Sequence, residues 1–144
     1  MTAEDLFRRI ITALDQAGIP HMLTGSFASA YHGSPRATQD IDLVIEADAD
    51  RIRTLVASLP AEAYYVDLDA ALTAIDAEGQ FNVIDLVSGW KIDLMIRKQR
   101  PFSLEEFDRR RSVELHGTSI KVVRWVQAFE LESEWKAACG MVGA

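Results

Sequence analysis

The chain has very little cysteine and no long apolar stretch. Of its 144 residues only Cys139 is a cysteine, which excludes a disulfide within one chain and leaves no Cys/His spacing typical of zinc sites. No apolar run approaches the roughly 20 residues that a membrane-spanning helix needs. The first residues, Met-Thr-Ala-Glu-Asp, are acidic, whereas a signal peptide begins with basic ones. These absences predict a soluble cytoplasmic protein without membrane contact.

The composition is that of an ordinary globular chain. Hydrophobic residues make up 49% and charged residues 26%, which is normal usage for a folded domain. A chain of this length can fold around one hydrophobic core without disulfides or a structural metal ion. No linker or repeat divides it, so we expect a single domain over residues 1–144, in which residues 125–144 form a short C-terminal helix and tail.

Charge is distributed unevenly along the chain. The formal net charge is −7, and residues 40–86 carry 2 basic and 11 acidic side chains, whereas residues 87–124 carry 9 basic and 5 acidic ones. The acidic sum argues against a protein that coats nucleic acid. The acidic net charge is compatible with a local basic surface on the last third of the chain.

Hydrophobic periodicity predicts alternating helices and strands. The predicted helices cover residues 3–17, 26–32, 49–59, 70–77 and 126–138. The predicted strands cover residues 21–25, 40–46, 64–68, 81–87, 91–97 and 119–124. Residues 88–90 read as a three-residue hairpin loop. This order is typical of an α/β (α+β) fold with a mixed sheet of about five to six strands flanked by helices.

Gly25 and Ser26 stand between a predicted strand and a predicted helix. Free backbone N–H groups at the start of a helix favour a phosphate, glycine permits its close approach, and the serine hydroxyl adds a hydrogen bond. The alternative is an ordinary turn in which Ser26 only caps the helix.

Three aspartates follow on two predicted strands. Asp40 and Asp42 face one side of the first strand, with Cα atoms about 6.5 Å apart, because side chains alternate along a strand. Asp93 faces the polar side of the second strand, which it shares with Lys91. Two ionised carboxylates on one face repel unless a cation lies between them, and hard oxygen ligands suit Mg²⁺. Three carboxylates can hold two metal ions for displacement at phosphorus, and Asp93 can accept the proton of an attacking hydroxyl. The alternative for Asp40 and Asp42 is a strand end with two solvated acids.

The combined motifs resemble a known superfamily. Gly25-Ser26, Asp40-x-Asp42 and the later Asp93 are similar to the pattern of the DNA polymerase β-type nucleotidyltransferases. Two segments resemble the small prokaryotic AbiEii-like members of this superfamily. They are Pro35-Arg36-Ala37-Thr38-Gln39-Asp40-Ile41-Asp42 and Gly89-Trp90-Lys91-Ile92-Asp93-Leu94. The resemblance covers roughly residues 5–124 and implies a nucleotidyltransferase fold.

The resemblance also implies roles and partners. Gly25 and Ser26 would bind the phosphates of an NTP, for example ATP, while Asp40 and Asp42 would ligate two Mg²⁺ ions. Asp93 would ligate the catalytic metal and activate the acceptor hydroxyl. The enzyme would move a nucleoside monophosphate onto an RNA end or a protein, as part of a toxin–antitoxin or phage-defence module. Longer members continue into a helical region that this chain lacks, so we expect a homodimer or a cognate partner, or alternatively a degenerate nucleotide- or partner-binding module.

Several neighbouring residues have two readings. Arg36 and Thr38 either contact phosphate or belong to an ordinary surface loop, and Lys91 pairs with the triphosphate or with an acidic neighbour. Asp85 would lie opposite Asp93 only if the hairpin loop is residues 88–90, and we leave it out of the site. Trp90 is expected to pack over the end of the sheet.

A basic cluster begins at the end of the strand predicted over residues 91–97 and consists of Arg97, Lys98, Arg100, Arg109, Arg110 and Arg111. It suits RNA or a triphosphate. Alternatively, it is a solvated face balanced by Glu105, Glu106 and Asp108, and we prefer this interpretation.

Overall fold

A computed structural model describes residues 3–24, 40–115 and 118–123, with the side chains of Ala3, Glu4, Asp40 and Leu115 outside the description. Within these ranges the chain forms four helices and seven strands. The helices are α1 (Ala3–Gln16), α3 (Ala49–Ser58), α4 (Leu68–Ala77) and α5 (Pro101–Asp108). The strands are β1 (His21–Leu23), β2 (Asp40–Ile45), β3 (Tyr64–Tyr65), β4 (Gln80–Asp85), β5 (Lys91–Ile96), β6 (Arg111–Leu115) and β7 (Thr118–Val122).

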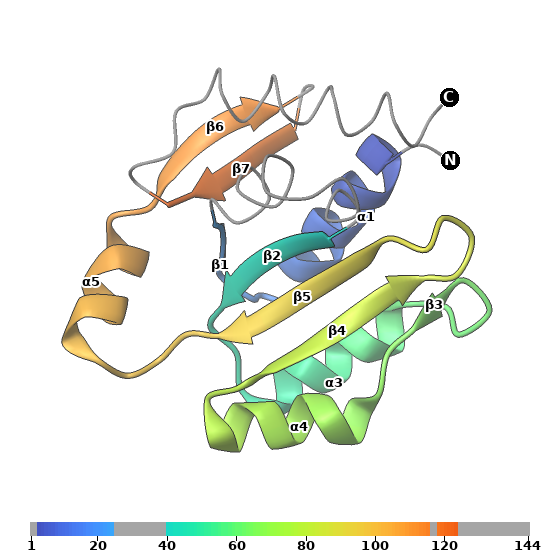
Figure 1. Cartoon of the computed structure of the whole chain (residues 1–144), viewed down its shortest axis with the longest axis horizontal. Helices are drawn as coiled ribbons and strands as arrows, with labels where there is room; N and C mark the ends of the chain where they lie inside the picture. The colour runs from blue at the N-terminus through green and yellow to red at the C-terminus, as the bar shows by residue number, and fades with distance from the viewer. Residues whose placement is uncertain (1–2, 25–39, 116–117, 124–144) are drawn as a thin grey trace.

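The strands form one open, mixed sheet in the order β3-β4-β5-β2-β1-β7-β6, which Figure 1 shows with β2 and β5 at its centre. β2 pairs with β5, and β1 with β7, in parallel; the other neighbours are antiparallel. The predicted α/β class with a mixed sheet and flanking helices is confirmed. The described sheet has seven strands rather than five to six.

The helices α1, α3 and α4 lie against one face of this sheet (Figure 1). Strand residues that point to that face are apolar and fully buried, as Leu43 and Leu94 show at 0% and 1% exposure. They pack with α1 through Leu6 and Ile10 and with α3 through Leu55. Burial of this apolar area stabilises the sheet–helix sandwich and leaves the polar strand residues on the opposite face.

Capping aspartates fix where two of these helices begin. The Asp48 carboxylate accepts a hydrogen bond from the Arg51 N–H at 2.9 Å at the start of α3. Asp67 accepts from the N–H groups of Asp69 and Ala70 at the start of α4, which satisfies donors that a helix end leaves open. The strand predicted over residues 64–68 was therefore too long, because Asp67 already caps the next helix and β3 ends at Tyr65.

The sequence reading missed two elements, α5 and β6. α5 begins with Pro101 in its first turn, a position that proline favours because a helix leaves that N–H unbonded. β6 pairs with β7 in antiparallel register from Arg111↔Val122 to Leu115↔Thr118, and residues 116–117 between them lie outside the described residues.

The remaining predicted helices, over residues 26–32 and 126–138, lie outside the described residues. The single-domain division over residues 1–144 stays a prediction. In the part of the chain that the structure describes, no helix is both long enough and apolar enough to cross a membrane.

Candidate active site on the polar face of the sheet

Asp42 and Asp93 lie side by side on the two central parallel strands. The register of β2 and β5 pairs Asp42 with Asp93 directly, so their Cα atoms are about 4.8 Å apart, the spacing of neighbouring strands. The flanking residues Ile41, Leu43 and Ile92 are buried on the helix side. Strand alternation therefore turns both carboxylates to the face opposite α1, α3 and α4.

The surroundings of the pair are polar but partly shielded from water. The side chain of Asp93 is 15% exposed, and the Lys91 Nζ atom lies 3.9 Å from its Oδ1 atom. On the other side of β5, Asn82 of β4 is the register partner of Asp93. One row across three strands thus holds an amide and two carboxylates, with an ammonium group two residues along β5.

Asn82 is the residue of this row to which the sequence reading assigned no role. The signal that would have found it is the register of the β4–β5 hairpin, which a single sequence does not fix when the loop length is uncertain. An amide oxygen is a hard donor of the kind that a divalent cation accepts, and an amide N–H₂ donates to a phosphate or hydroxyl oxygen.

The strand β1 brings the chain to the same place. The backbone N–H of Thr24 donates to the Asp42 carbonyl oxygen at 3.2 Å, and Gly25 and Ser26 follow Thr24 directly in the sequence. Gly25 and Ser26 themselves, with Arg36 and Thr38, lie outside the described residues. The backbone of Asp40 belongs to β2 and is the register partner of Lys91.

The described oxygen donors, which are the carboxylates of Asp42 and Asp93 and the amide of Asn82, are ligands that a divalent cation accepts. Carboxylate and amide oxygens suit Mg²⁺, which keeps part of its shell for water and phosphate. Among the described residues no group of three His, Cys, Asp or Glu side chains gathers in a way that could hold a metal ion. The three-carboxylate set needs the side chain of Asp40, so the two-metal site stays a prediction.

The β4–β5 connection differs from the predicted hairpin. Five residues, 86–90, separate the strands, and the Asp85 N–H closes the loop on the Trp90 carbonyl oxygen at 2.9 Å. The Asp85 carboxylate accepts from the N–H and the hydroxyl of Ser88, which holds residues 86 and 87 in a turn instead of a strand. Asp85 is therefore not opposite Asp93: it is 1% exposed and points to the helix side. Trp90 is fully buried, as its predicted packing requires.

The basic cluster gathers around α5 and forms specific contacts. The Arg97 guanidinium lies 3.1 Å from the Glu46 carboxylate, and Arg109 lies 2.7 Å from Glu105. Arg97 and Arg110 both stack on the Phe107 ring, at 5.4 and 4.2 Å from its centroid. Such cation–π contacts stabilise by roughly 0.5–2 kcal/mol each, so these two arginines have a packing role that holds α5 to the sheet.

Comparison with known proteins gives distant likenesses among solved structures. No family model matches the chain, and no curated protein matches it either. A solved structure from Thermotoga maritima, described as a "putative nucleotidyltransferase", is 20% identical, with a TM-score of 0.46 over 99% of this chain and 89% of that chain. At this identity and score the likeness assigns no residue of the site. The candidate site is defined by the strand register, which places Asp42 beside Asp93 on the polar face of the central strands.

Proposed function

We propose that the chain is a Mg²⁺-dependent nucleotidyltransferase, which moves a nucleoside monophosphate from an NTP such as ATP to a hydroxyl group of an acceptor. The observation that carries the proposal is the direct register pairing of Asp42 with Asp93 in the two central parallel strands. Two partly shielded carboxylates at this spacing are costly to keep charged unless a cation lies between them.

The transfer needs a nucleophile, a leaving group and a proton acceptor. The acceptor oxygen forms a bond to the α-phosphorus, the bond from that phosphorus to the bridging oxygen of the β-phosphate breaks, and pyrophosphate leaves with the electron pair. The proton of the acceptor hydroxyl passes to the Asp93 carboxylate, which is only partly exposed and therefore less solvated than a surface acid.

Asp40, Asp42 and Asp93 would hold two Mg²⁺ ions. Bound there, the ions would polarise the phosphate oxygens and stabilise the charge that develops in the transfer. Gly25 and Ser26, which follow Thr24 beside Asp42, would bind the β- and γ-phosphates. Arg36, Thr38 and Lys91 would supply positive charge and hydrogen bonds to the same triphosphate.

Lys91 supports a second candidate function. Its ammonium group lies 3.9 Å from the Asp93 carboxylate, so part of the charge that a metal ion would neutralise is already neutralised by the protein. A domain that binds a nucleotide or a protein partner without catalysis would keep such a pair. This degenerate module is the alternative to the enzyme.

The proposed acceptor and biological setting rest on the resemblance of the motifs. An RNA end or a protein hydroxyl is the acceptor class that we propose, because the motif text resembles AbiEii-like members of toxin–antitoxin or phage-defence modules. A second copy of the chain or a cognate partner would then complete the acceptor-binding surface.

A labelling experiment tests the proposed transfer. The protein is incubated with Mg²⁺, a cell lysate and each of the four NTPs labelled at the α-phosphate, and nuclease and protease digestion identifies the labelled product. Asp42→Asn and Asp93→Asn remove one carboxylate each, and Glu62→Gln, an exposed acid between α3 and β3, is the matched control. We expect label with the wild type and Glu62→Gln only. Nucleotide binding without label for any NTP would overturn the enzyme and support the binding module.

A further inference from the structure

A separate groove lies between α1 and the connection from α3 to β3. It has a volume of about 340 Å³ and is lined from α1 by Arg9 and Ala13, from the connection by Leu59 and Pro60, and from β3 by Tyr64. Since α1 and α3 cover the face opposite Asp42 and Asp93, the groove is distinct from the candidate active site. Its volume is in the range of sites for small organic ligands, roughly 300–1,000 Å³.

Tyr64 contributes a buried hydroxyl group to the lining of this groove. Tyr64 is 5% exposed, and its hydroxyl is buried without a hydrogen-bond partner among the described residues. Buried polar groups in folded proteins nearly always have a partner, because leaving one unpaired costs about 1–3 kcal/mol. The chain keeps an unpaired hydroxyl here although phenylalanine would fill the same space.

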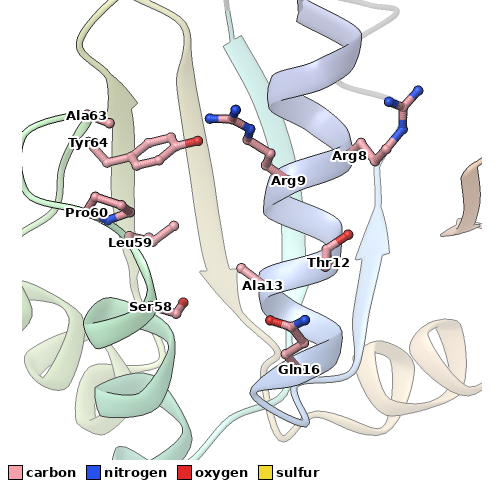
Figure 2. A pocket seen from close by; sticks show the side chains of 10 residues that line it. All are labelled: Arg8, Arg9, Thr12, Ala13, Gln16, Ser58, Leu59, Pro60, Ala63 and Tyr64. Atoms are coloured by element: carbon pink, nitrogen blue, oxygen red, sulfur yellow. The ribbon is translucent and has the colours of Figure 1, made fainter.

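The position of Tyr64 is fixed by its backbone. Its N–H donates to the Pro60 carbonyl oxygen at 3.0 Å, and its register partner on β4 is the buried Asp85. The ring therefore projects from a rigid strand end toward α1, as Figure 2 shows.

Arg9 supplies the second donor. It is exposed and forms no ion pair within the described part of the chain, whereas its neighbour Arg8 pairs with Asp5 at 3.4 Å. Figure 2 shows the Arg9 guanidinium and the Tyr64 hydroxyl pointing toward one another across the groove. Both groups donate hydrogen bonds, so an oxyanion between them would accept from both.

The remaining lining is half apolar and half polar. Ala13, Leu59, Pro60 and Ala63 form apolar walls beside the two donors, and the polar residues Arg8, Thr12, Gln16 and Ser58 complete the lining. From this arrangement we propose that the groove binds a small organic anion, whose carboxylate or phosphate group lies between Arg9 and Tyr64 and whose apolar body contacts these walls. The site does not depend on the proposed nucleotidyl transfer.

The test uses three small probes and nuclear magnetic resonance on the full chain. Benzoate carries the carboxylate, phenyl phosphate carries the phosphate, and benzamide is the uncharged counterpart of benzoate. We expect one or both anions to shift the amide signals of residues 9–16 and 58–64, and the tighter of the two identifies the head group. Equal binding of benzamide and benzoate, or no shift with either anion, would overturn the proposal.

Variants separate the two donors from the fold. Tyr64→Phe removes only the hydroxyl and is expected to weaken binding about tenfold, the equivalent of one hydrogen bond to a charged group. Arg9→Gln is expected to weaken it similarly and to remove its dependence on salt. Arg53→Gln, an exposed arginine of α3 outside the groove lining, is the charge-matched control and should bind as the wild type does.

Thermal unfolding completes the test. Because Tyr64→Phe removes an unpaired buried hydroxyl, its unfolding midpoint is expected to equal or exceed that of the wild type. Unchanged probe affinity in a folded Tyr64→Phe variant would contradict the role of the hydroxyl. Transfer activity is expected to persist in this variant, so a failure of the groove proposal is distinguishable from a failure of the active-site proposal.

Discussion

Neutralising Asp42 is expected to stabilise the protein in metal-free buffer and to remove its response to Mg²⁺. Asp42 and Asp93 are register partners on adjacent strands, and each raises the free energy of the folded state by repelling the other. Asn has nearly the shape of Asp but no charge, so Asp42→Asn removes the repulsion and keeps the packing. The free energy of unfolding should therefore rise.

The size of the effect follows from the spacing. Two unit charges about 5 Å apart repel by about 3 kcal/mol at an effective dielectric constant of about 20. Lys91, at 3.9 Å from Asp93 with a side chain 39% exposed, offsets part of this repulsion, and solvent screens a further part. A net gain of about 1 kcal/mol remains, which raises the unfolding midpoint of a chain of this size by roughly 2–5 °C.

Differential scanning calorimetry with a chelator and then with Mg²⁺ measures both parts of the prediction. An ion that binds only the folded state stabilises it by about 1.4 kcal/mol when its concentration is about ten times its dissociation constant. The wild type and the Glu62→Gln control should show this increase, and Asp42→Asn should not. A lower midpoint for Asp42→Asn in chelator, or a full Mg²⁺ response in that variant, would refute the reasoning about the paired carboxylates.

Three further predictions concern the β4–β5 connection and are measured by denaturant unfolding. Trp90→Ala should lower the free energy of unfolding by about 3–5 kcal/mol because the fully buried indole leaves a cavity; a loss below 1 kcal/mol would contradict this packing. Gly89→Ala should cost about 1–2 kcal/mol from backbone strain alone, because Gly89 has φ +80° and an added Cβ would have no atom within 4 Å; no loss would mean that the turn adopts another conformation. Asp85→Ala should cost about 1–3 kcal/mol by releasing the N–H and hydroxyl of Ser88, and a Ser88→Ala variant that costs as much or more would point to Ser88 rather than Asp85 as the group that fixes the turn.

The centre of the sheet could be predicted from the sequence because its pattern is local and repeated. Apolar residues alternate with Asp40, Asp42, Lys91 and Asp93 in two short segments, which fixes both strands and the side to which the charged residues belong. The placement of Asp93 on a strand next to Asp42 was confirmed by the register of β2 and β5.

The hairpin register could not be predicted because it depends on one carboxylate. The interaction of Asp85 with Ser88 makes residues 86 and 87 part of a turn, although Val87 has a high strand preference. The register then brings Asn82 rather than Asp85 opposite Asp93. A local side-chain hydrogen bond thus outweighs the intrinsic preference of Val87.

The groove beside Tyr64 could not be predicted because its walls come from distant parts of the chain. Arg9 lies on α1 and Tyr64 on β3, and the sequence gives no sign that these two donors face one another. α5 was missed for a different reason: its hydrophobic pattern is short, and the arginines around it contact Phe107 and Glu46 instead of solvent alone.

Metal binding at Asp42 and Asp93 is the central claim, and Mn²⁺ tests it most directly. Mn²⁺ accepts the oxygen ligands that suit Mg²⁺ and broadens the amide signals of residues close to it in nuclear magnetic resonance spectra. The account predicts that a low Mn²⁺ concentration broadens the signals of residues 41–43 and 92–94 first. Excess Mg²⁺ should restore these signals, and Asp42→Asn should prevent the broadening. Sharp signals at both strands, with broadening centred elsewhere in the chain, would contradict it.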